Sequence, residues 1–164
     1  MNPDVIIIGS GLAGLSYALQ AAKKSTVLLV TKTQLLESNS HIAQGGIAAV
    51  FEPSDNFQKH IQDSLIAGAH HNDKNAVKYF VQKAPQTIKN LEALGVPFTK
   101  KDEKFSQNLE AGHSRPRIIH AADHSGKTII ETLAKLVKKS RNITIWEKSF
   151  AVDLIVKNKI CLEM

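Results

Sequence analysis

The sequence predicts an α/β fold with a central parallel sheet, and three patterns carry this prediction. A short run, Val5–Ile8, is apolar on both alternating faces, as in a central parallel strand covered on both sides. Glycines spaced as G-x-G-x-x-G, beginning at Gly9, follow it directly, and apolar residues then recur at helical spacing up to Lys23. A second buried run, 27–30, completes a βαβ unit of about thirty residues. We therefore predict a Rossmann-like, dinucleotide-binding arrangement.

Downstream of this unit the pattern predicts helices separated by loops. Residues 33–56 have the composition of a long loop, and the short helix that follows can end at Gly68. Asp73 has a suitable side chain to cap a longer helix, which Gly95 can end. Pro85 interrupts that helix, so we expect a kink or two abutting helices there.

The last third of the chain predicts two more strands. A polar stretch, 99–108, leads to a second loop at 110–114. Apolar residues at helical spacing over 129–137 predict a helix, which precedes a third strand at 143–146. We expect a fourth strand over 151–156, followed by a turn. Because such a turn needs a returning strand, and because a three-stranded sheet leaves its first strand with an exposed apolar edge, we expect the front part of a longer protein.

Composition excludes several classes of protein. The chain has 164 residues, enough for one domain, with 43% hydrophobic and 22% charged residues, which is ordinary for a soluble globular protein and unlike a disordered one. The early apolar run is far too short to span a membrane, and the first residues lack the positive region of a signal peptide. We therefore expect a cytoplasmic protein without a membrane partner.

The net charge of +6 raises the possibility of a nucleic-acid partner, but the pattern does not favour one. The lysines are spread along the chain, mostly at expected helix ends and turns, where they stay solvated. Only two tyrosines and one tryptophan are present, too few for a stacking platform. We predict no nucleic-acid binding.

The sequence offers little for a metal site. One cysteine, Cys161, excludes an internal disulfide framework and a cysteine metal cage. His120 and His124 have the spacing of a zinc pair on one helical turn, but no glutamate follows the first histidine, as hydrolytic sites require. We predict that no metal is bound.

The glycine motif indicates a dinucleotide. Gly9 permits a tight turn, Gly11 lets the backbone approach a pyrophosphate, and Gly14 allows the helix to pack closely on the strand. The helix N-terminus then offers free N–H groups to phosphates. One departure is that Thr31-Lys32 occupies the place where such folds usually carry an acidic residue for the ribose. The lysine either favours an extra phosphate, as in NADP, or contacts the adenosine side in another way; spacing alone leaves both open.

A competing motif lies at 121–128, which fits a relaxed phosphate-binding loop in which Lys127 would reach phosphates and Thr128 would hold magnesium. It lacks the leading glycine, and Asp153, the downstream candidate for the metal, lies inside its expected strand. We favour the simpler interpretation that Ser125 caps the following helix.

Two loops carry further candidate groups. Around Gln44, two glycines amid small apolar residues allow close approach to a flat ring, whose heteroatoms the glutamine can hydrogen-bond. The segment 110–117 groups a carboxylate, a histidine and two arginines. These arginines either grip a dicarboxylate or are paired on the surface.

Together these segments resemble the L-aspartate oxidases, flavoprotein relatives of the flavoprotein subunits of succinate dehydrogenase and fumarate reductase. The resemblance runs from Val5 to about Leu162, nearly the whole chain. It rests on residues 9–14, 43–50, 63–68, 95–98, 110–114, 117–123 and 151–156.

The resemblance implies FAD as the cofactor. Relatives with covalent flavin carry a histidine five residues before the glutamine; Asn39 occupies that place here, so we predict non-covalent FAD. The residues that the resemblance assigns to the cofactor are Gly9, Ser10, Gly11, Leu12, Ala13, Gly14, Lys32, Asn39, Ser40, His41, Ile42, Ala43, Gln44, Gly45, Gly46, Phe150 and Ala151.

It also implies a reaction and its partners. Glu110 is expected to lie at the substrate and to orient the amino group of L-aspartate, which would be oxidised to iminoaspartate by hydride transfer to the flavin. Oxygen or fumarate would reoxidise the flavin, and quinolinate synthase would take the product in NAD biosynthesis. The alternatives are a flavoprotein of the succinate dehydrogenase and fumarate reductase type and, with less support, a phosphate-loop nucleotide binder.

Members of this family are far longer than 164 residues. We therefore expect 1–164 to be the N-terminal part of an FAD-binding domain, incomplete at its C-terminus, without the capping domain and the remainder of the flavin fold. Because a flavin ring must be enclosed to be positioned for hydride transfer, we expect this chain alone to bind FAD weakly and to lack turnover.

Overall fold

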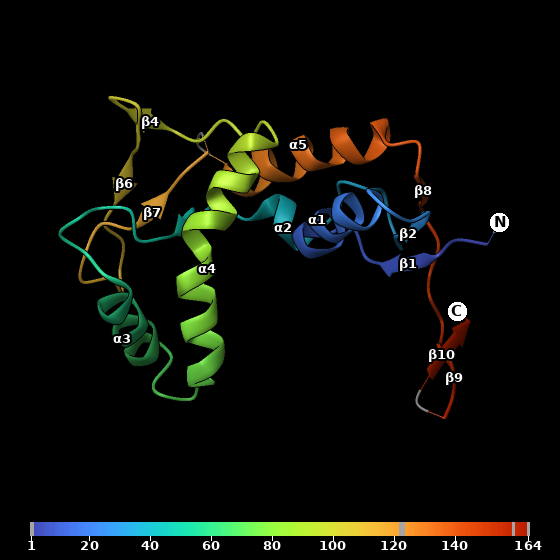
Figure 1. Cartoon of the computed structure of the whole chain (residues 1–164), viewed down its shortest axis with the longest axis horizontal. Coiled ribbons are helices and arrows are strands. Elements are labelled where there is room, and N and C mark those ends of the chain that lie inside the picture. Colours follow the sequence, from blue (N-terminus) through green and yellow to red (C-terminus); the bar gives the residue numbers. More distant parts are fainter. Residues whose placement is uncertain (1, 122–123, 159, 164) are drawn as a thin grey trace. The chain divides into compact units, whose positions relative to one another are not determined.

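The computed structural model describes residues 2–121, 124–158 and 160–163, and it divides into two compact units. The first unit contains the residues up to Ile42 together with those from Ile129 onwards, and the second contains Ala43–Thr128. Most elements of both units are labelled in Figure 1.

The first unit contains the predicted parallel sheet. Its strands are β1 (Val5–Ile8), β2 (Val27–Val30) and β8 (Ile143–Trp146), in the order β1-β2-β8. All four residues of β2 are buried, and helix α1 (Leu12–Ala21) connects β1 to it. The α/β class and the βαβ unit are therefore confirmed.

Strand β1 lies at the edge of this three-stranded sheet, as we expected for its first strand. The expectation that both of its faces are covered is wrong. Ile6 is 43% exposed and Ile8 53%, whereas Ile7 is buried. An apolar strand indicates burial, but it does not indicate which segment provides the cover.

The C-terminal strand begins later than predicted. In place of a strand over 151–156, β9 (Ile155–Lys157) pairs antiparallel with β10 (Ile160–Glu163). The Oδ1 atom of Asp153 accepts a hydrogen bond from the Leu154 N–H at 2.7 Å, a local bond that competes with strand pairing. Asp153 thus lies before the strand, not inside it.

Helix α5 (Ser125–Lys139) carries a buried apolar face at the predicted positions, including Ile129, Leu133 and Val137. Ser125, however, is its first helical residue, and the Ser125 hydroxyl accepts the N–H of Ala121 at 3.0 Å. The prediction that Ser125 caps the helix is therefore wrong. Residues 122 and 123, which belong to the phosphate-loop hypothesis, lie outside the described residues.

The second unit contains the two predicted helices and several short strands. Asn56 and Asp73 accept N–H groups of α3 and α4 and so cap them, the latter as predicted. The elements of this unit are β3 (Ile47–Ala48), α3 (Phe57–Ala67), α4 (Lys74–Ala93), β4 (Lys100–Lys101), β5 (Lys104–Phe105), β6 (Gln107–Asn108) and β7 (Ile118–Ile119).

Three of these features correct the sequence analysis. The expected loop over 33–56 contains α2 (Asn39–Ile42), which belongs to the first unit, and β3. The polar stretch 99–108 forms the β4–β5 hairpin and then β6, which pairs with β7. Strand β3 pairs with β7, far along the chain, so no local pattern reveals it; the β4–β5 hairpin is local, but its strands have only two residues each.

Helix α4 continues through Pro85 as one helix, so the alternative of two abutting helices is wrong (Figure 1). Proline removes one helical N–H, but Val81 and Ile88 on either side of it are both buried. Packing on both halves therefore outweighs the lost hydrogen bond. Within the described ranges, no helix combines the length and apolar character needed to cross a membrane.

Candidate functional site

A cavity of about 330 Å³ lies at the carboxyl ends of β1 and β2 in the first unit. The turn after β1 forms one wall: Gly9 has a φ of +101°, and its N–H donates to the Val30 carbonyl at 2.8 Å. This is the conformation that favours glycine at the first position of the motif. The residues predicted to bind the cofactor that line this cavity are Gly9, Ser10, Gly11, Lys32, Asn39, Phe150 and Ala151.

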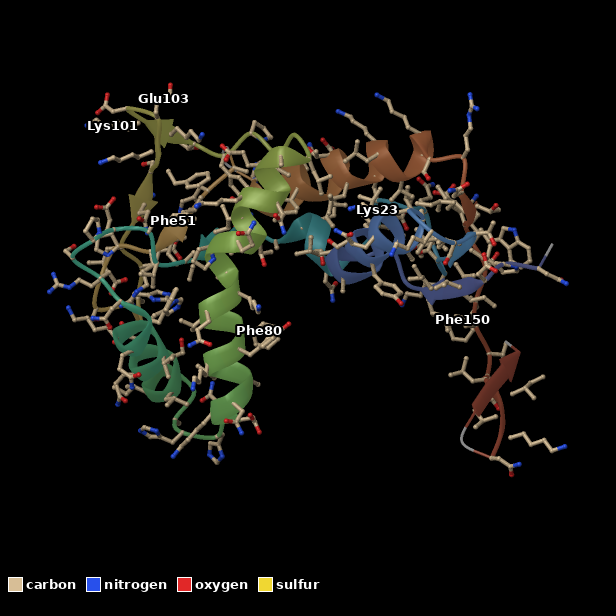
Figure 2. The ribbon with its side chains drawn as sticks, viewed as in Figure 1. Lys23, Phe51, Phe80, Lys101, Glu103 and Phe150 are labelled. Atoms are coloured by element: carbon tan, nitrogen blue, oxygen red, sulfur yellow. The ribbon has the colours of Figure 1, made fainter. Side chains whose placement is uncertain are left out.

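The segment with Phe150 is held to the end of β2 by backbone hydrogen bonds. The N–H of Ser149 donates to the Thr31 carbonyl at 3.0 Å, and that of Lys148 donates to the Thr33 carbonyl at 3.1 Å. Phe150 itself is 73% exposed (Figure 2). Two segments more than a hundred residues apart thus meet at one cavity.

The end of β2 shows what replaces the usual acidic residue. Thr31 is buried, and its hydroxyl lies 3.1 Å from that of Ser10, which ties the glycine turn to β2. Lys32 is exposed and lines the cavity. Glu37 lines it as well, a residue that sequence reasoning missed. Because Glu37 lies seven residues after β2 and not directly at its end, no sequence motif pointed to it.

The glycine turn meets α1 closely. A Cβ at Gly14 would overlap the carbonyl oxygen of Gly9, so only glycine allows this packing. At Gly11, the N-cap of α1, a Cβ would meet only the Ser40 hydroxyl, at an ordinary 3.4 Å. Ser40 also accepts the N–H of Leu12 at 3.2 Å. Leu12, Ala13 and Gly14 therefore open the helix behind the cavity.

All four residues of helix α2 are in the predicted set, and the last two have different surroundings. Ile42 is 73% exposed, whereas His41 is half-buried, with its Nε2 atom 3.6 Å from the Glu131 carboxylate. The N–H of His41 donates to the carbonyl of Ser38, which lines the cavity.

The remaining predicted cofactor residues, 43–46, belong to the second unit. Ala43, Gln44 and Gly45 are exposed, and the Ala43 carbonyl accepts the N–H of Gly126 at 3.1 Å. Gly46 is different: a Cβ there would overlap the carbonyl oxygen of Ile119 in β7. The double glycine thus has one open position and one that needs glycine for packing.

Glu110 lies in the loop 109–116, between β6 and β7 of the second unit. Its side chain is 47% exposed, and its Oε1 atom lies 3.4 Å from Nε2 of His120. The sequence grouped these two residues only through the resemblance. The structure brings them together because β7 returns beside β6.

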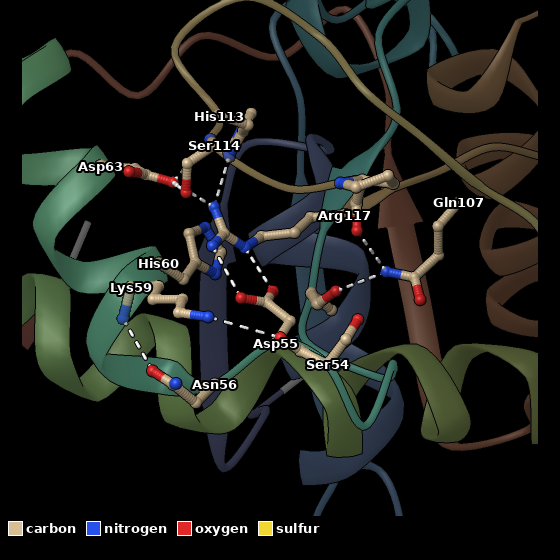
Figure 3. A network of polar contacts seen from close by, with 12 residues as sticks. Ser54, Asp55, Asn56, Lys59, His60, Asp63, Gln107, His113, Ser114 and Arg117 are labelled. Carbon is tan, nitrogen blue, oxygen red and sulfur yellow. Dashed lines mark hydrogen bonds and ion pairs between the residues drawn. The ribbon is translucent and has the colours of Figure 1, made fainter.

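Arg117, at the end of the same loop, is fully buried in an ionic cluster (Figure 3). Its Nε and Nη2 atoms donate to the two oxygens of Asp55 at 2.6 and 2.9 Å, and Nη1 donates to Asp63. For Arg117, both alternatives from the sequence, gripping a dicarboxylate or pairing on the surface, are wrong. Its partners lie 62 and 54 residues away, where no motif pointed.

The cluster shifts the ionisation of its neighbours. Burial opposes the charged form of Asp63, but hydrogen bonds from Arg117 and Ser114 outweigh it and hold the pKa of Asp63 at about 2. Burial, helped by the positive charge of Arg117, lowers the pKa of His60 to about 4. The ring of His60 lies 5.4 Å from that of His113.

We expect acid to destabilise the protein in two windows. His60 stays neutral in the folded chain but protonates near pH 6.5 when unfolded, so its contribution is present above pH 6.5 and is lost as the pH falls to about 4. This loss is on the order of 3 kcal/mol. The contribution of Asp63 is present above pH 3.8 and is lost towards pH 2. Urea unfolding at pH 7 and 4.5 measures the first window.

The control for this pH dependence is His60→Leu, which keeps an apolar group of similar size in the buried position. Its free energy of unfolding should change much less between pH 7 and 4.5 than that of the unaltered chain. An equal fall in both proteins would assign the pH dependence to other groups.

Comparison with known proteins identifies the family. Residues 4–164 match the family model described as FAD binding domain. The chain belongs to this FAD-binding domain family. The prediction of FAD as cofactor is thereby confirmed, and the family favours the flavin interpretation over the phosphate-loop hypothesis. The non-covalent attachment stays a prediction.

Relatives of this FAD-binding domain confirm the resemblance drawn from the motifs. It is 42% identical over 158 residues to an L-aspartate oxidase from Acinetobacter baylyi, covering 96% of this chain and 29% of that protein. L-aspartate oxidase 1 of Ralstonia nicotianae is 43% identical, with 99% of this chain and 31% of the relative covered. The chain thus spans about three tenths of the length of these relatives.

Solved structures similar to this FAD-binding domain come from a related group. A variant of the E. coli quinol fumarate reductase matches with a TM-score of 0.90 and 28% identity, covering 96% of this chain and 28% of that one. The Mycobacterium smegmatis Sdh1 complex matches with a TM-score of 0.87 and the same identity, covering 95% of this chain and 29% of that one.

The residues present fit an FAD. Helix α1 begins at Gly11, which has no side chain to cap the first turn. Although Ser40 accepts the N–H of Leu12, the first turn keeps other N–H groups for a phosphate. Gly11 lines the cavity, and because it has no side chain a pyrophosphate can approach its backbone. Lys32 adds a positive charge at the same cavity. In the described part of the chain, no group of three or more His, Cys, Asp or Glu side chains could hold a metal ion.

Proposed function

We propose that this chain is the FAD-binding portion of an L-aspartate oxidase, which oxidises L-aspartate to iminoaspartate with oxygen or fumarate as the electron acceptor. The observation that carries the proposal is 42–43% identity to L-aspartate oxidases over nearly the whole chain, combined with a cavity lined by the motif residues. The downstream user of iminoaspartate, quinolinate synthase, and the cytoplasmic location stay predictions.

Each wall of the cavity has a chemical role in this proposal. The N-terminus of α1 and the backbone of Gly9–Gly11 bind the pyrophosphate. Lys32 faces the adenosine side, and Glu37 supplies the carboxylate for the ribose hydroxyls that β2 itself lacks. When bound, FAD supplies the hydride acceptor; the protein supplies its position.

Glu110 orients the substrate. Its carboxylate attracts the ammonium group of L-aspartate and holds the nitrogen in place. This nitrogen must lose a proton before the hydride leaves the neighbouring carbon, because only the neutral amine has the electron pair that forms the C=N bond. The nearby His120 nitrogen, 3.4 Å away, limits where the carboxylate can point. A dicarboxylate without an amino group, such as succinate, cannot make this charge-assisted contact, which favours an amino acid as the substrate.

Replacing Gly11 by alanine is expected to weaken FAD binding at least about tenfold while the protein stays folded. The added methyl group meets only Ser40 at 3.4 Å, so the fold accepts it, but it takes the space for the pyrophosphate. The measurement is the flavin absorbance retained after excess FAD is added and the protein is desalted, followed by a fluorescence titration.

Lys23→Ala is the matched control, because Lys23 is an exposed residue just beyond the other end of α1 (Figure 2). It should bind FAD as the unaltered chain does. Equal FAD binding by Gly11→Ala and the unaltered chain would contradict the cavity assignment. If neither the unaltered chain nor any variant retains flavin, the family assignment stands. The assay must then be repeated on a form of the protein that encloses the flavin ring.

The second candidate is a succinate or fumarate enzyme, favoured by the TM-scores of 0.90 and 0.87 to structures of that group. The two candidates differ in substrate. An active form containing this chain should reduce its flavin with L-aspartate under anaerobic conditions and leave it oxidised with succinate. Flavin reduction by succinate alone would favour the second candidate.

A further inference from the structure

The loop 109–116 is anchored poorly by apolar packing. Leu109 is 61% exposed, and the next residues from Glu110 to Gly112 are exposed too. Its two ends are joined by the Arg117 N–H, which donates to the Asn108 carbonyl at 3.1 Å. A loop of this kind needs polar contacts to hold one conformation.

Gln107 donates to the Pro116 carbonyl at 3.2 Å and Glu110 lies 3.4 Å from His120, but three further contacts converge on one atom. Asp63 Oδ2, from helix α3, accepts the N–H of Ser114 at 2.8 Å and its hydroxyl at 2.7 Å. The same oxygen also accepts Nη1 of Arg117. Figure 3 shows Ser114 and Arg117 approaching this carboxylate together. One side chain of α3 therefore fastens both the middle and the end of the loop.

The other partner of the arginine makes this anchor rigid. Asp55 binds Arg117 through both oxygens, so the guanidinium cannot swing away from Asp63. None of the hydrogen bonds described for Asp55 involves a residue of the loop 109–116, which precedes Arg117 in the chain. The two carboxylates therefore have different roles: Asp55 holds the guanidinium of Arg117 in place, and Asp63 holds the loop 109–116.

We propose that Asp63 and Ser114 are positioning residues that hold the Glu110 loop in the conformation that receives the substrate's amino group. This inference rests on the proposed function for the role of Glu110. The loop's attachment to α3 is independent of that role. Loss of the Ser114 hydroxyl removes a hydrogen bond to a charged group, which typically changes an equilibrium about tenfold.

The first experiment measures amide hydrogen exchange of His113, whose N–H donates to the Glu110 carbonyl at 3.2 Å, in this chain without substrate or cofactor. Ser114→Ala should speed this exchange about tenfold, whereas Ser114→Thr, which keeps the hydroxyl, should restore slow exchange. Ser114 is exposed, so neither variant disturbs the core. Exchange that Ser114→Ala leaves unchanged would overturn the proposal.

The matched control is Asp55→Asn. It weakens the same ionic cluster but leaves both Ser114 contacts to Asp63 in place. If the loop depends on Asp63 and Ser114, Asp55→Asn should change the exchange of the His113 amide less than Ser114→Ala does. A larger change in Asp55→Asn would mean that general stability, and not the Ser114 contact, holds the loop.

The second experiment uses an aspartate-oxidising form of the protein that contains this chain. Ser114→Ala should raise the KM for L-aspartate about tenfold with kcat within about threefold, and Ser114→Thr should restore the KM. An unchanged KM, or a loss confined to kcat, would overturn the positioning role. If no form oxidises aspartate, the proposed function fails, and the exchange experiment still decides whether the loop is anchored in this way.

Discussion

Arg117→Met is expected to lower the free energy of unfolding by about 3–5 kcal/mol. Arg117 is fully buried, and its removal leaves Asp55, whose side chain is 2% exposed, as a buried carboxylate without its cation. Asp63 loses the same partner. The penalty is large because two negative charges then remain without compensation, not because the ion pair itself is strong.

Urea unfolding followed by circular dichroism measures this effect. Arg115→Met is the control, because Arg115 is exposed and lies only two residues away; it should change stability by less than about 0.5 kcal/mol. Asp55→Asn combined with Arg117→Met should be less destabilising than the sum of the single variants, since the orphaned charge is removed. A loss below about 1 kcal/mol for Arg117→Met would show that water reaches the cluster.

Gly14→Ala is expected to destabilise the first unit by about 3 kcal/mol or more and to abolish FAD binding. The new Cβ would overlap the backbone carbonyl of Gly9, and no rotation of a side chain relieves a clash with backbone. Helix α1 must then move away from β1, which breaks the turn that lines the cavity.

Thermal unfolding and flavin retention measure the consequences together. Gly11→Ala is the matched control, since it adds the same methyl group three residues earlier with only an ordinary contact to Ser40. It should lose FAD binding without losing stability, whereas Gly14→Ala should lose both. Equal stability of the two variants would mean that α1 can shift on the strand without strain.

The parts of the fold that depend on local pattern could be predicted. The βαβ unit follows from apolar runs and three glycines, and the cap at Asp73 follows from its side chain, since each signal lies within a few residues of its effect. Pro85 was misjudged because its cost is local, while the burial of Val81 and Ile88 that outweighs it is tertiary.

The candidate site divides in the same way. Residues of the glycine turn, which we predicted to bind the cofactor, line the cavity, whereas Glu37 and the partners of Arg117 were not found from the sequence. Asp55 and Asp63 are eight residues apart, on either side of the start of α3. This spacing does not distinguish them from two solvated surface carboxylates. Only the approach of β7 to this region reveals that they share an arginine.

The order of the strands along the chain also governs how the protein folds during its synthesis. β2 pairs with β8, more than a hundred residues later, while the whole second unit lies in one continuous stretch between them. At ordinary rates of translation, the central strand waits on the order of ten seconds for its second neighbour. We therefore expect the second unit to fold first on the ribosome, with Val27–Val30 open to chaperones until residue 146 emerges.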